Sequence, residues 1–216
     1  MHAQRLGLKN YSILASHVLV PPAMEAVIND EEAQIQGFLA AGHVCTIMGI
    51  SKYEPIVQNY KIPMVVTGFE PVDLLQGILM VVRQLEKGEY KLENQYSRVV
   101  KSEGNPEAQK VIRQVFETED REWRGIGTIP MSGWGVKGEL AEYNANKKFS
   151  VNIPKALECA DCIAGQVLKG IKKPFECSQF GKACTPLNPL GAPMVSSEGA
   201  CAAYYHFAET VEEVEI

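Results

Sequence analysis

Cysteines are concentrated near the end of this 216-residue chain, and their distribution constrains the fold and the chemistry more than any other feature. Five of the six cysteines are Cys159, Cys162, Cys177, Cys184 and Cys201, and the first two form a short C-x2-C pair. Thiolates in such numbers are typical ligands of iron–sulfur clusters and of structural zinc. The wide spacing of the other three argues against a zinc finger or ribbon, which needs short cysteine pairs on both sides of the metal.

Two other interpretations of the cysteines are buried small residues and a disulfide framework. Disulfide scaffolds belong mainly to short secreted chains. The first residues, Met-His-Ala-Gln-Arg, lack the apolar stretch of a secretory signal, and no run approaches the about 18 apolar residues of a membrane span. We therefore expect a cytoplasmic protein whose thiols stay reduced and available to a metal, four of the five serving as ligands.

The overall composition is that of an ordinary globular protein. Hydrophobic residues make up 46% of the chain and charged residues 22%. The net charge of −5 and the pI of about 5.5 offer no basic face for nucleic acid. A polynucleotide partner is therefore not expected, and the length allows one or two domains.

Strand and helix patterns alternate along the first part of the chain. We expect strands at 11–18, 36–41 and 62–68, and helices at 21–29, at 51–60 and from Pro71 to Gly88. The last helix has an apolar stripe at helical spacing: Leu74, Leu75, Ile78, Leu79, Val82 and Leu85. Such alternation predicts an α/β fold with a parallel sheet.

The second part of the chain has weaker patterns. Asn105 and Pro106 predict a helix start, 122–129 a strand and 131–135 a turn. Short helices are expected at 164–169 and near the C-terminal end of the cysteine-rich region. A loop-rich region of this kind needs a staple, which a bound metal would supply.

Three polar residues follow predicted strands at the edge where parallel α/β sheets bind ligands. His43 follows the second strand, and Glu70 and Asp73 follow the third. These side chains could meet in one crevice and act there as a proton shuttle and as cation or donor ligands. The alternative is structural, because a carboxylate at a helix start stabilises the helix dipole and a lone histidine usually packs.

Several strings in the chain resemble the HypD family of [NiFe]-hydrogenase formation proteins. The matching strings are Gly42-His43-Val44, Gly68-Phe-Glu-Pro-x-Asp-Leu-Leu-Gln-Gly77, Glu93-Asn-Gln-Tyr-x-Arg-Val-Val100, Glu122-Trp-Arg-Gly125, Phe180-Gly181 and Val195-Ser-Ser-Glu-Gly-Ala-Cys-Ala-Ala203. They occur in the family's order and extend nearly from end to end of the chain.

The resemblance implies a maturation scaffold. Proteins of this family carry, with a HypC-type chaperone, the iron that receives cyanide and carbon monoxide, and a HypE-type protein donates the cyanide. The resemblance also implies a [4Fe–4S] cluster on Cys162, Cys177, Cys184 and Cys201, with Cys159 as the alternative first ligand. Glu198 is a further candidate catalytic residue beside the last cysteine, whereas Cys45 matches no ligand position and is interpreted as a buried thiol.

The chain also departs from the family pattern. Full-length members carry C-G-G-H-T-H, G-P-G-C-P-V-C and G-F-E-T-T strings ahead of the region seen here, and none of these strings occurs in this chain. The cysteine that is thought to bind the iron is therefore missing, as is the redox-capable cysteine pair. We expect either a truncated or split form that works with a separate N-terminal HypD fragment, or an incomplete gene model.

The expected organisation is a partial Rossmann-like α/β domain followed by a cysteine-rich iron–sulfur domain of loops and helices. The predicted boundaries are 1–100 for the partial domain, 101–153 for a connecting segment, 154–208 for the [4Fe–4S] domain and 209–216 for an acidic tail. The expected role of the cluster is that of an electron relay. Two alternatives are a structural metal module for protein interaction and an independent iron–sulfur enzyme with only three cysteine ligands.

Overall fold

The computed structural model describes residues 1–149 and 159–208, which fall into two compact units. The first unit contains Met1–Glu25, Ile35–Glu119 and the residues from Met131 to the gap. The second contains Ala26–Gln34, Asp120–Pro130 and the residues that follow the gap. The predicted tail at 209–216 and the predicted domain start at 154 lie outside the described residues. The four domain boundaries stay a prediction.

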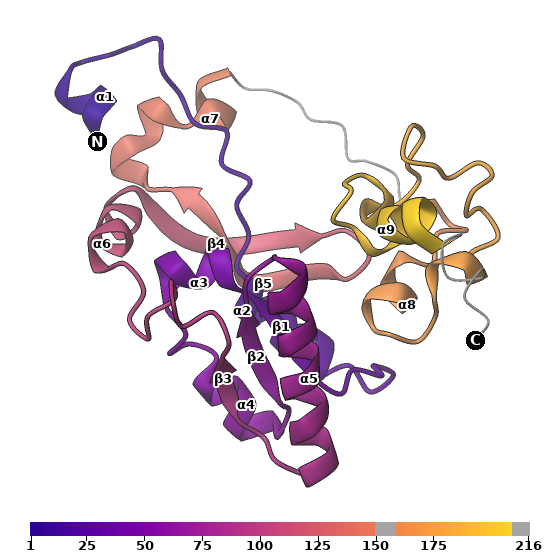
Figure 1. Cartoon of the computed structure of the whole chain (residues 1–216). Helices are drawn as coiled ribbons and strands as arrows, with labels where there is room; N and C mark the ends of the chain where they lie inside the picture. Colours follow the sequence, from indigo (N-terminus) through magenta and orange to yellow (C-terminus); the bar gives the residue numbers. More distant parts are fainter. Residues whose placement is uncertain (150–158, 209–216) are drawn as a thin grey trace. The chain divides into compact units, whose positions relative to one another are not determined.

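A three-stranded parallel sheet forms the centre of the first unit (Figure 1). Its strands are β1 (Phe38–Ala41), β2 (Met64–Thr67) and β3 (Leu92–Asn94), in the order β1-β2-β3. All residues of β2 are buried, because a central strand of a parallel sheet has neighbours on both edges and cover on its faces. The predicted parallel α/β arrangement is therefore confirmed.

The helices up to residue 149 lie before, between and after these strands along the chain, and those at Gly42–Met48 and Pro71–Lys87 contact β1 and β2. They are α1 (His2–Arg5), α2 (Val20–Ile28), α3 (Gly42–Met48), α4 (Glu54–Tyr60), α5 (Pro71–Lys87), α6 (Pro106–Val115) and α7 (Ala145–Phe149), with a 3-10 helix η1 (Gly138–Tyr143). Gly88 ends α5 with a φ of 65°, and the Asn105 side chain caps α6 by accepting from the backbone N–H of Ala108 at 3.1 Å. Among the described residues, no helix combines the length and apolar character that a membrane span requires.

The segment 11–18 is not a strand of the sheet, contrary to the sequence prediction. It makes only isolated bridges, from Ile13 to Asn144 and from Val18 to Gly133. Its backbone hydrogen bonds therefore go to residues far along the chain, and Leu14 is 60% exposed. The apolar composition predicted extended backbone correctly, but strand pairing depends on a partner that local sequence does not reveal.

A two-stranded sheet of β4 (Phe116–Trp123) and β5 (Gly127–Val136) replaces the single strand predicted at 122–129. The chain turns between them, where the backbone N–H of Ile126 donates to the carbonyl of Trp123 at 3.0 Å. Gly125 has a φ of 86°, which favours glycine in this turn. Residues 131–135, predicted as a turn, belong to β5.

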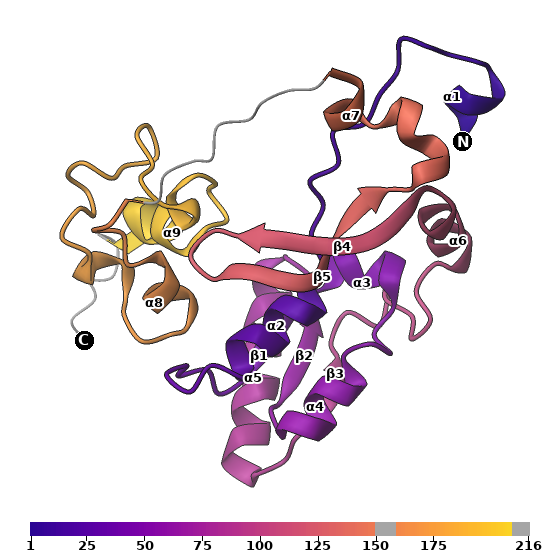
Figure 2. The same ribbon diagram turned by 180° about the vertical axis from the view of Figure 1, so that it is seen from behind.

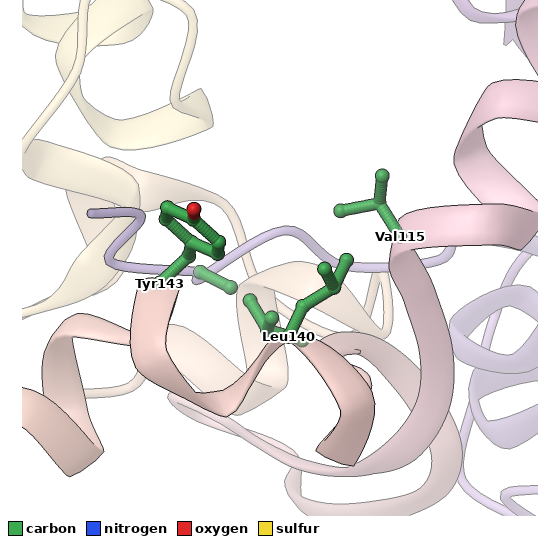
Figure 3. Close-up of a cluster of buried hydrophobic side chains, with 5 residues drawn as sticks. Val115, Leu140 and Tyr143 are labelled. Atoms are coloured by element: carbon green, nitrogen blue, oxygen red, sulfur yellow. The ribbon is translucent and has the colours of Figure 1, made fainter. Parts of the chain in front are cut away.

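The polar loops of the first unit are anchored by a small apolar cluster. Figure 3 shows Val115 at the end of α6 with Leu140 and Tyr143 of η1. The other buried members are Ala15 and Val136. These residues come from segments far apart in the sequence, so the cluster joins α6, β5 and η1 to the segment that contains Ala15.

Short elements separated by loops form the second unit. They are α8 (Ala164–Leu168), the 3-10 helices η2 (Pro174–Glu176) and η3 (Ala192–Met194), and α9 (Ala200–Phe207). In the described part of this unit, Cys184, Met194 and Ala202 form a buried cluster. Figure 2 shows how much of the unit is loop rather than helix. Helices were predicted at α8 and near α9, and both are present.

Candidate functional site

Four cysteines of the second unit line one small cavity. Cys162, Cys177, Cys184 and Cys201 share it with apolar neighbours such as Phe180. The remaining lining residues are Ile163, Ala164, Gly191, Pro193 and Met194. Segments up to 39 positions apart in the sequence thus bring their thiols to one place.

Different elements position the thiols. Cys162 lies in a turn in which its backbone N–H donates to the carbonyl of Cys159 at 2.9 Å, and α8 begins directly afterwards. Cys177 follows η2, where its N–H donates to the carbonyl of Pro174 at 3.1 Å. Cys184 is buried in the core of the unit, and Cys201 lies in the first turn of α9.

Two glycines allow these segments to come close together. A Cβ atom added at Gly191 would overlap the Sγ atom of Cys162, and one added at Gly199 would overlap the carbonyl of Pro193. Both positions therefore require glycine, because any side chain there would prevent the close approach of these segments. Gly199 directly precedes α9, so its contact sets where the helix with Cys201 begins.

The thiols also influence one another electrostatically. Burial, and after it the neighbouring thiols of Cys162, Cys184 and Cys177, raises the pKa of Cys201 to about 11. Burial likewise raises the pKa of Cys162. Such shifts disfavour the thiolates when no cation is present, whereas a bound metal reverses this preference because it stabilises coordinated thiolate.

The donor set, four thiols that line one cavity, is of the chemical kind that holds an iron–sulfur cluster. Within the described parts of the chain, no group of three or more His, Cys, Asp or Glu side chains is arranged so that it could hold one metal ion. A cubane cluster distributes its four cysteine ligands over different irons and therefore needs a wider ring of thiols. The backbone N–H of Leu190 also donates to the sulfur of Cys184 at 3.4 Å, a kind of contact that tunes cluster potentials.

Cys159 does not line the four-thiol cavity. It lies on a neighbouring pocket of about 400 Å³, together with Arg124 and Lys169. The Nζ atom of Lys169 binds the carboxylate of Asp30 at 2.7 Å, which raises the pKa of the lysine. Because Cys162 lines the four-thiol cavity and Cys159 lines only the neighbouring pocket, the geometry favours Cys162 over Cys159 as a member of the four-thiol set.

His43 lines a separate cavity, in the first unit. This cavity measures about 810 Å³, within the range of small-molecule sites, and its walls are mainly apolar. His17 also lines it, as does Trp134. The His43 ring packs against Phe69 at a centroid distance of 4.9 Å. Glu70 and Asp73 are not among the residues that line this cavity, so the three predicted residues do not share one crevice.

Asp73 forms a two-pronged ion pair. Its carboxylate oxygens accept from the two terminal nitrogens of Arg98, at 2.8 and 2.7 Å, and Oδ1 also accepts from Gln95 at 2.8 Å. These hydrogen bonds, first those from Arg98, lower the pKa of Asp73 to about 2. The guanidinium also lies over the Tyr96 ring at 4.5 Å. Asp73 thus links the start of α5 to the segment that follows β3.

The remaining predicted residues lie elsewhere. The Glu70 carboxylate is 78% exposed and contacts Arg98 at 3.4 Å. Glu198 is exposed on the loop before α9, where its backbone N–H donates to the Ser196 hydroxyl at 3.2 Å. Cys45 is fully buried, as predicted, and its burial raises the pKa of the thiol.

Sequence reasoning missed Arg98 and Gln95 as partners of Asp73. Both residues lie in the Glu93–Val100 string that carries the family resemblance. Their role depends on a contact across 25 and 22 positions of the chain, which no local pattern predicts. A signal that could have found these partners is that the string begins in the strand that follows α5. Neighbouring parallel strands have their carboxyl ends at the same edge of the sheet, so residues after that strand lie near the start of α5.

The chain matches a family model and several curated relatives. The model is described as "Hydrogenase formation hypA family", under the name HypD, and matches residues 1–208. The hydrogenase expression/formation protein HupD of Azotobacter chroococcum mcd 1 is 47% identical over 211 residues, which is 95% of this chain and 56% of the relative. The hydrogenase maturation factor HypD of Azotobacter vinelandii is 44% identical over 218 residues, 98% of this chain and 58% of the relative.

A third relative, the hydrogenase maturation factor HypD of Rhodobacter capsulatus, is 45% identical over 210 residues and is covered to 56%. The chain therefore spans somewhat more than half the length of the curated relatives it matches. The match extends through both units, from the sheet of the first to the four cysteines of the second. The chain belongs to the HypD family of hydrogenase formation proteins.

Proposed function

We propose that this chain is part of a [NiFe]-hydrogenase maturation scaffold for the Fe(CN)2CO centre and holds a [4Fe–4S] cluster through Cys162, Cys177, Cys184 and Cys201. The observation that carries the proposal is the single cavity lined by these four thiols. The family membership supports the maturation role, because the relatives are named as hydrogenase maturation factors.

The residues of this chain would do three things for the cluster. The four thiolates bind it, the apolar side chains of Phe180 and Met194 exclude water from it, and the N–H of Leu190 hydrogen-bonds one ligand sulfur. A bound [4Fe–4S] cluster supplies one-electron transfer, which suits an electron relay during attachment of cyanide and carbon monoxide to iron. The iron with these ligands is cargo, and its family cysteine is missing from this sequence.

The partners follow from the same proposal. They are a HypC-type chaperone, a HypE-type cyanide donor and a separate HypD fragment that carries the missing iron-site strings. His43 lies in an apolar cavity of the first unit, where an imidazole can move a proton near neutral pH. The exposed Glu198 lies two residues before α9, in the loop next to the Cys201 ligand, and is available to a docked partner.

The cluster is tested by anaerobic purification with iron and sulfide analysis. Cys162→Ser, Cys177→Ser, Cys184→Ser and Cys201→Ser should each reduce the bound iron to less than about half of the wild-type four per chain, because a cubane needs all four thiolates. Cys159→Ser should retain the cluster, and Cys45→Ser serves as the control for loss of a thiol elsewhere. Retention of a full cluster in the Cys184→Ser protein would remove this cysteine from the ligand set, and bleaching by only three of the substitutions would favour an enzyme with an open iron.

A second function, a structural metal staple for a protein-interaction module, is favoured by one observation. Among the described residues of the second unit, the buried cluster of Cys184, Met194 and Ala202 is small. A unit with so little apolar core gains stability from a bound metal. Redox titration separates the two functions, because a relay is reduced by dithionite and reoxidised reversibly, whereas a staple stays in one oxidation state or contains zinc.

A further inference from the structure

Helix α5 exposes a broad apolar face. Leu75 is 67% exposed and Val72 63%, values unusual for leucine and valine on an amphipathic helix. The exposed apolar residues of the helix are Val72, Leu74, Leu75, Ile78, Leu79, Val82 and Leu85. Leu75, Ile78, Leu79 and Val82 follow the i, i+3, i+4, i+7 pattern and therefore lie on one side.

The opposite side of α5 packs on the sheet. Asp73, Gly77 and Gln84 are the buried residues of the helix. A Cβ atom added at Gly77 would overlap the Thr67 methyl group of β2, so the backbone of α5 lies directly on the sheet at this point. The buried side chain of Gln84 has a hydrogen-bond partner on this side, because its Oε1 accepts from the backbone N–H of Lys91 at 2.8 Å. The apolar face is therefore the one that points away from β1 and β2.

The edge of the sheet next to this face is open. Strand β1 pairs with β2, and within the described residues no strand pairs with its other edge. Leu39 of β1 is 40% exposed, and its Cδ2 atom would lie 3.3 Å from a Cβ atom at Gly77. Leu39 thus connects the strand edge with the helix. We call the exposed face of α5 together with Leu39 and the outer edge of β1 the α5–β1 surface; Figure 1 shows α5 beside these strands.

Each part of the α5–β1 surface can be covered by a particular kind of secondary structure. An open strand edge has unpaired N–H and C=O groups that another strand satisfies. A row of exposed leucine, isoleucine and valine side chains on a helix is covered by another apolar helix or loop, since large exposed apolar patches mark interaction sites. A strand followed by an apolar helix would satisfy both at once.

The relatives from Azotobacter extend well beyond the matched stretch, which accounts for 56% and 58% of their lengths. We infer that the α5–β1 surface binds a strand–helix segment from the part of the HypD protein that lies outside this matched stretch. A second copy of the chain fits less well, because a two-fold axis would place two β1 edges antiparallel beside an otherwise parallel sheet.

Co-expression tests the inference. The 216-residue chain is produced together with the tagged, unmatched portion of the Azotobacter chroococcum relative, and the amount of chain recovered through the tag is measured. Leu75→Glu and Leu79→Glu should reduce recovery at least about tenfold, because a carboxylate in an apolar interface is desolvated without a partner. Val111→Glu is the matched control, since Val111 is a 50% exposed apolar residue on the different helix α6.

Hydrogen exchange places the contact. In the complex, amides of Phe38–Ala41 should exchange more slowly than in the chain alone, as expected when a strand is added at the open edge. Recovery that is equal for Leu75→Glu and wild type, or no recovery of wild type at all, would overturn the inference. A dimer of the chain alone that Leu79→Glu converts to monomer would assign the surface to a second copy instead.

The inference rests on family membership and on the surface, and it does not depend on the cluster. Iron analysis of the Leu75→Glu and Leu79→Glu proteins therefore separates the two proposals. Wild-type iron content with lost binding supports the surface alone. Unchanged binding in a Cys184→Ser protein without iron would show that the surface works when the cluster proposal fails or its metal is lost.

Discussion

Asp73 shows how a residue that sequence reasoning places in a functional crevice can be committed to a structural contact. Its carboxylate receives three hydrogen bonds from Arg98 and Gln95 and is almost fully buried. A bidentate arginine–carboxylate pair is strong and geometrically specific. Removing one partner would leave the other charge without its counter-ion, so both residues matter for the conformation of the segment after β3.

The low pKa of Asp73 predicts how stability depends on pH. Its pKa is about 2 in the folded protein and close to 4 in an unfolded chain. The contribution of this group is therefore fully present above about pH 4 and is lost as the pH falls through about 2. Chemical unfolding of the wild type between pH 2 and 5 should show this loss.

The Asp73→Asn protein should be less stable at pH 7 and should show a flatter pH dependence between about 2 and 4. Glu70→Gln is the control, because Glu70 is largely exposed and contacts the same arginine at 3.4 Å. The unfolding curve of Glu70→Gln should remain close to that of the wild type at pH 7 and between about pH 2 and 4. An equal effect of the two substitutions would contradict the assignment of the ion pair to Asp73.

At the scale of elements, the contact between α5 and β2 depends on one small residue. Gly77 has no space for a methyl group, because Thr67 lies against it. Gly77→Ala should therefore destabilise the protein by about 1–3 kcal/mol through overpacking, even though alanine is the better helix former. Thermal or urea unfolding measures the difference.

Gly138→Ala is the matched control for that substitution. Gly138 begins η1, has no positive φ, and a Cβ atom there would meet nothing within 4 Å. Its stability should change by no more than about 0.5 kcal/mol. If Gly77→Ala were as stable as Gly138→Ala, the close approach of α5 to β2 would be refuted.

The elements with local end signals could be predicted from the sequence. Pro71 and Gly88 mark both ends of α5, and Asn105 with Pro106 marks the start of α6. The predicted helix start at Ser51 was wrong: α4 begins at Glu54, after a turn over residues 51–53, and its N-cap residue Tyr53 makes no side-chain capping hydrogen bond. Helix-end signals such as proline, glycine and asparagine act on the neighbouring backbone, so they can be recognised in the sequence without knowledge of the fold.

The elements with distant partners could not be predicted. The segment 11–18 has the composition of a strand but bridges to Asn144 and Gly133. The exposure of the apolar face of α5 could not be predicted either, since the periodicity identifies the apolar stripe but does not tell which residues cover it. For the site, the cysteine pattern left five candidates and the family resemblance implied four of them, whereas the fold places Cys159 outside the cavity that the other four line.

For the whole molecule, the two compact units differ in what holds them together. The first unit has a sheet with fully buried strand residues, whereas the second depends on a small cluster around Cys184 and Met194. Removal of a bound cluster should therefore loosen the second unit alone, since metal binding energy is part of its folding energy. Amide exchange of residues 164–207 should become at least about tenfold faster after chelation.

The sheet of the first unit provides the internal reference in this experiment. Exchange of Phe38–Ala41 and Met64–Thr67 should not change when iron is removed, because no cysteine of the cavity lies in these strands. Equal acceleration in both units would show that the cluster stabilises the chain globally. No acceleration anywhere would show that the second unit folds without it.

The burial of Cys45 has a practical consequence for thiol chemistry. Its side chain is fully inaccessible beneath Tyr53, and burial raises its pKa, so both access and ionisation protect it from alkylation. An alkylating reagent applied to the native, iron-free protein should modify the partly exposed Cys159 and Cys177 first and spare Cys45. Cys45 lies on the buried side of α3, so the rate at which it is finally labelled would measure how often this helix opens away from the rest of the first unit.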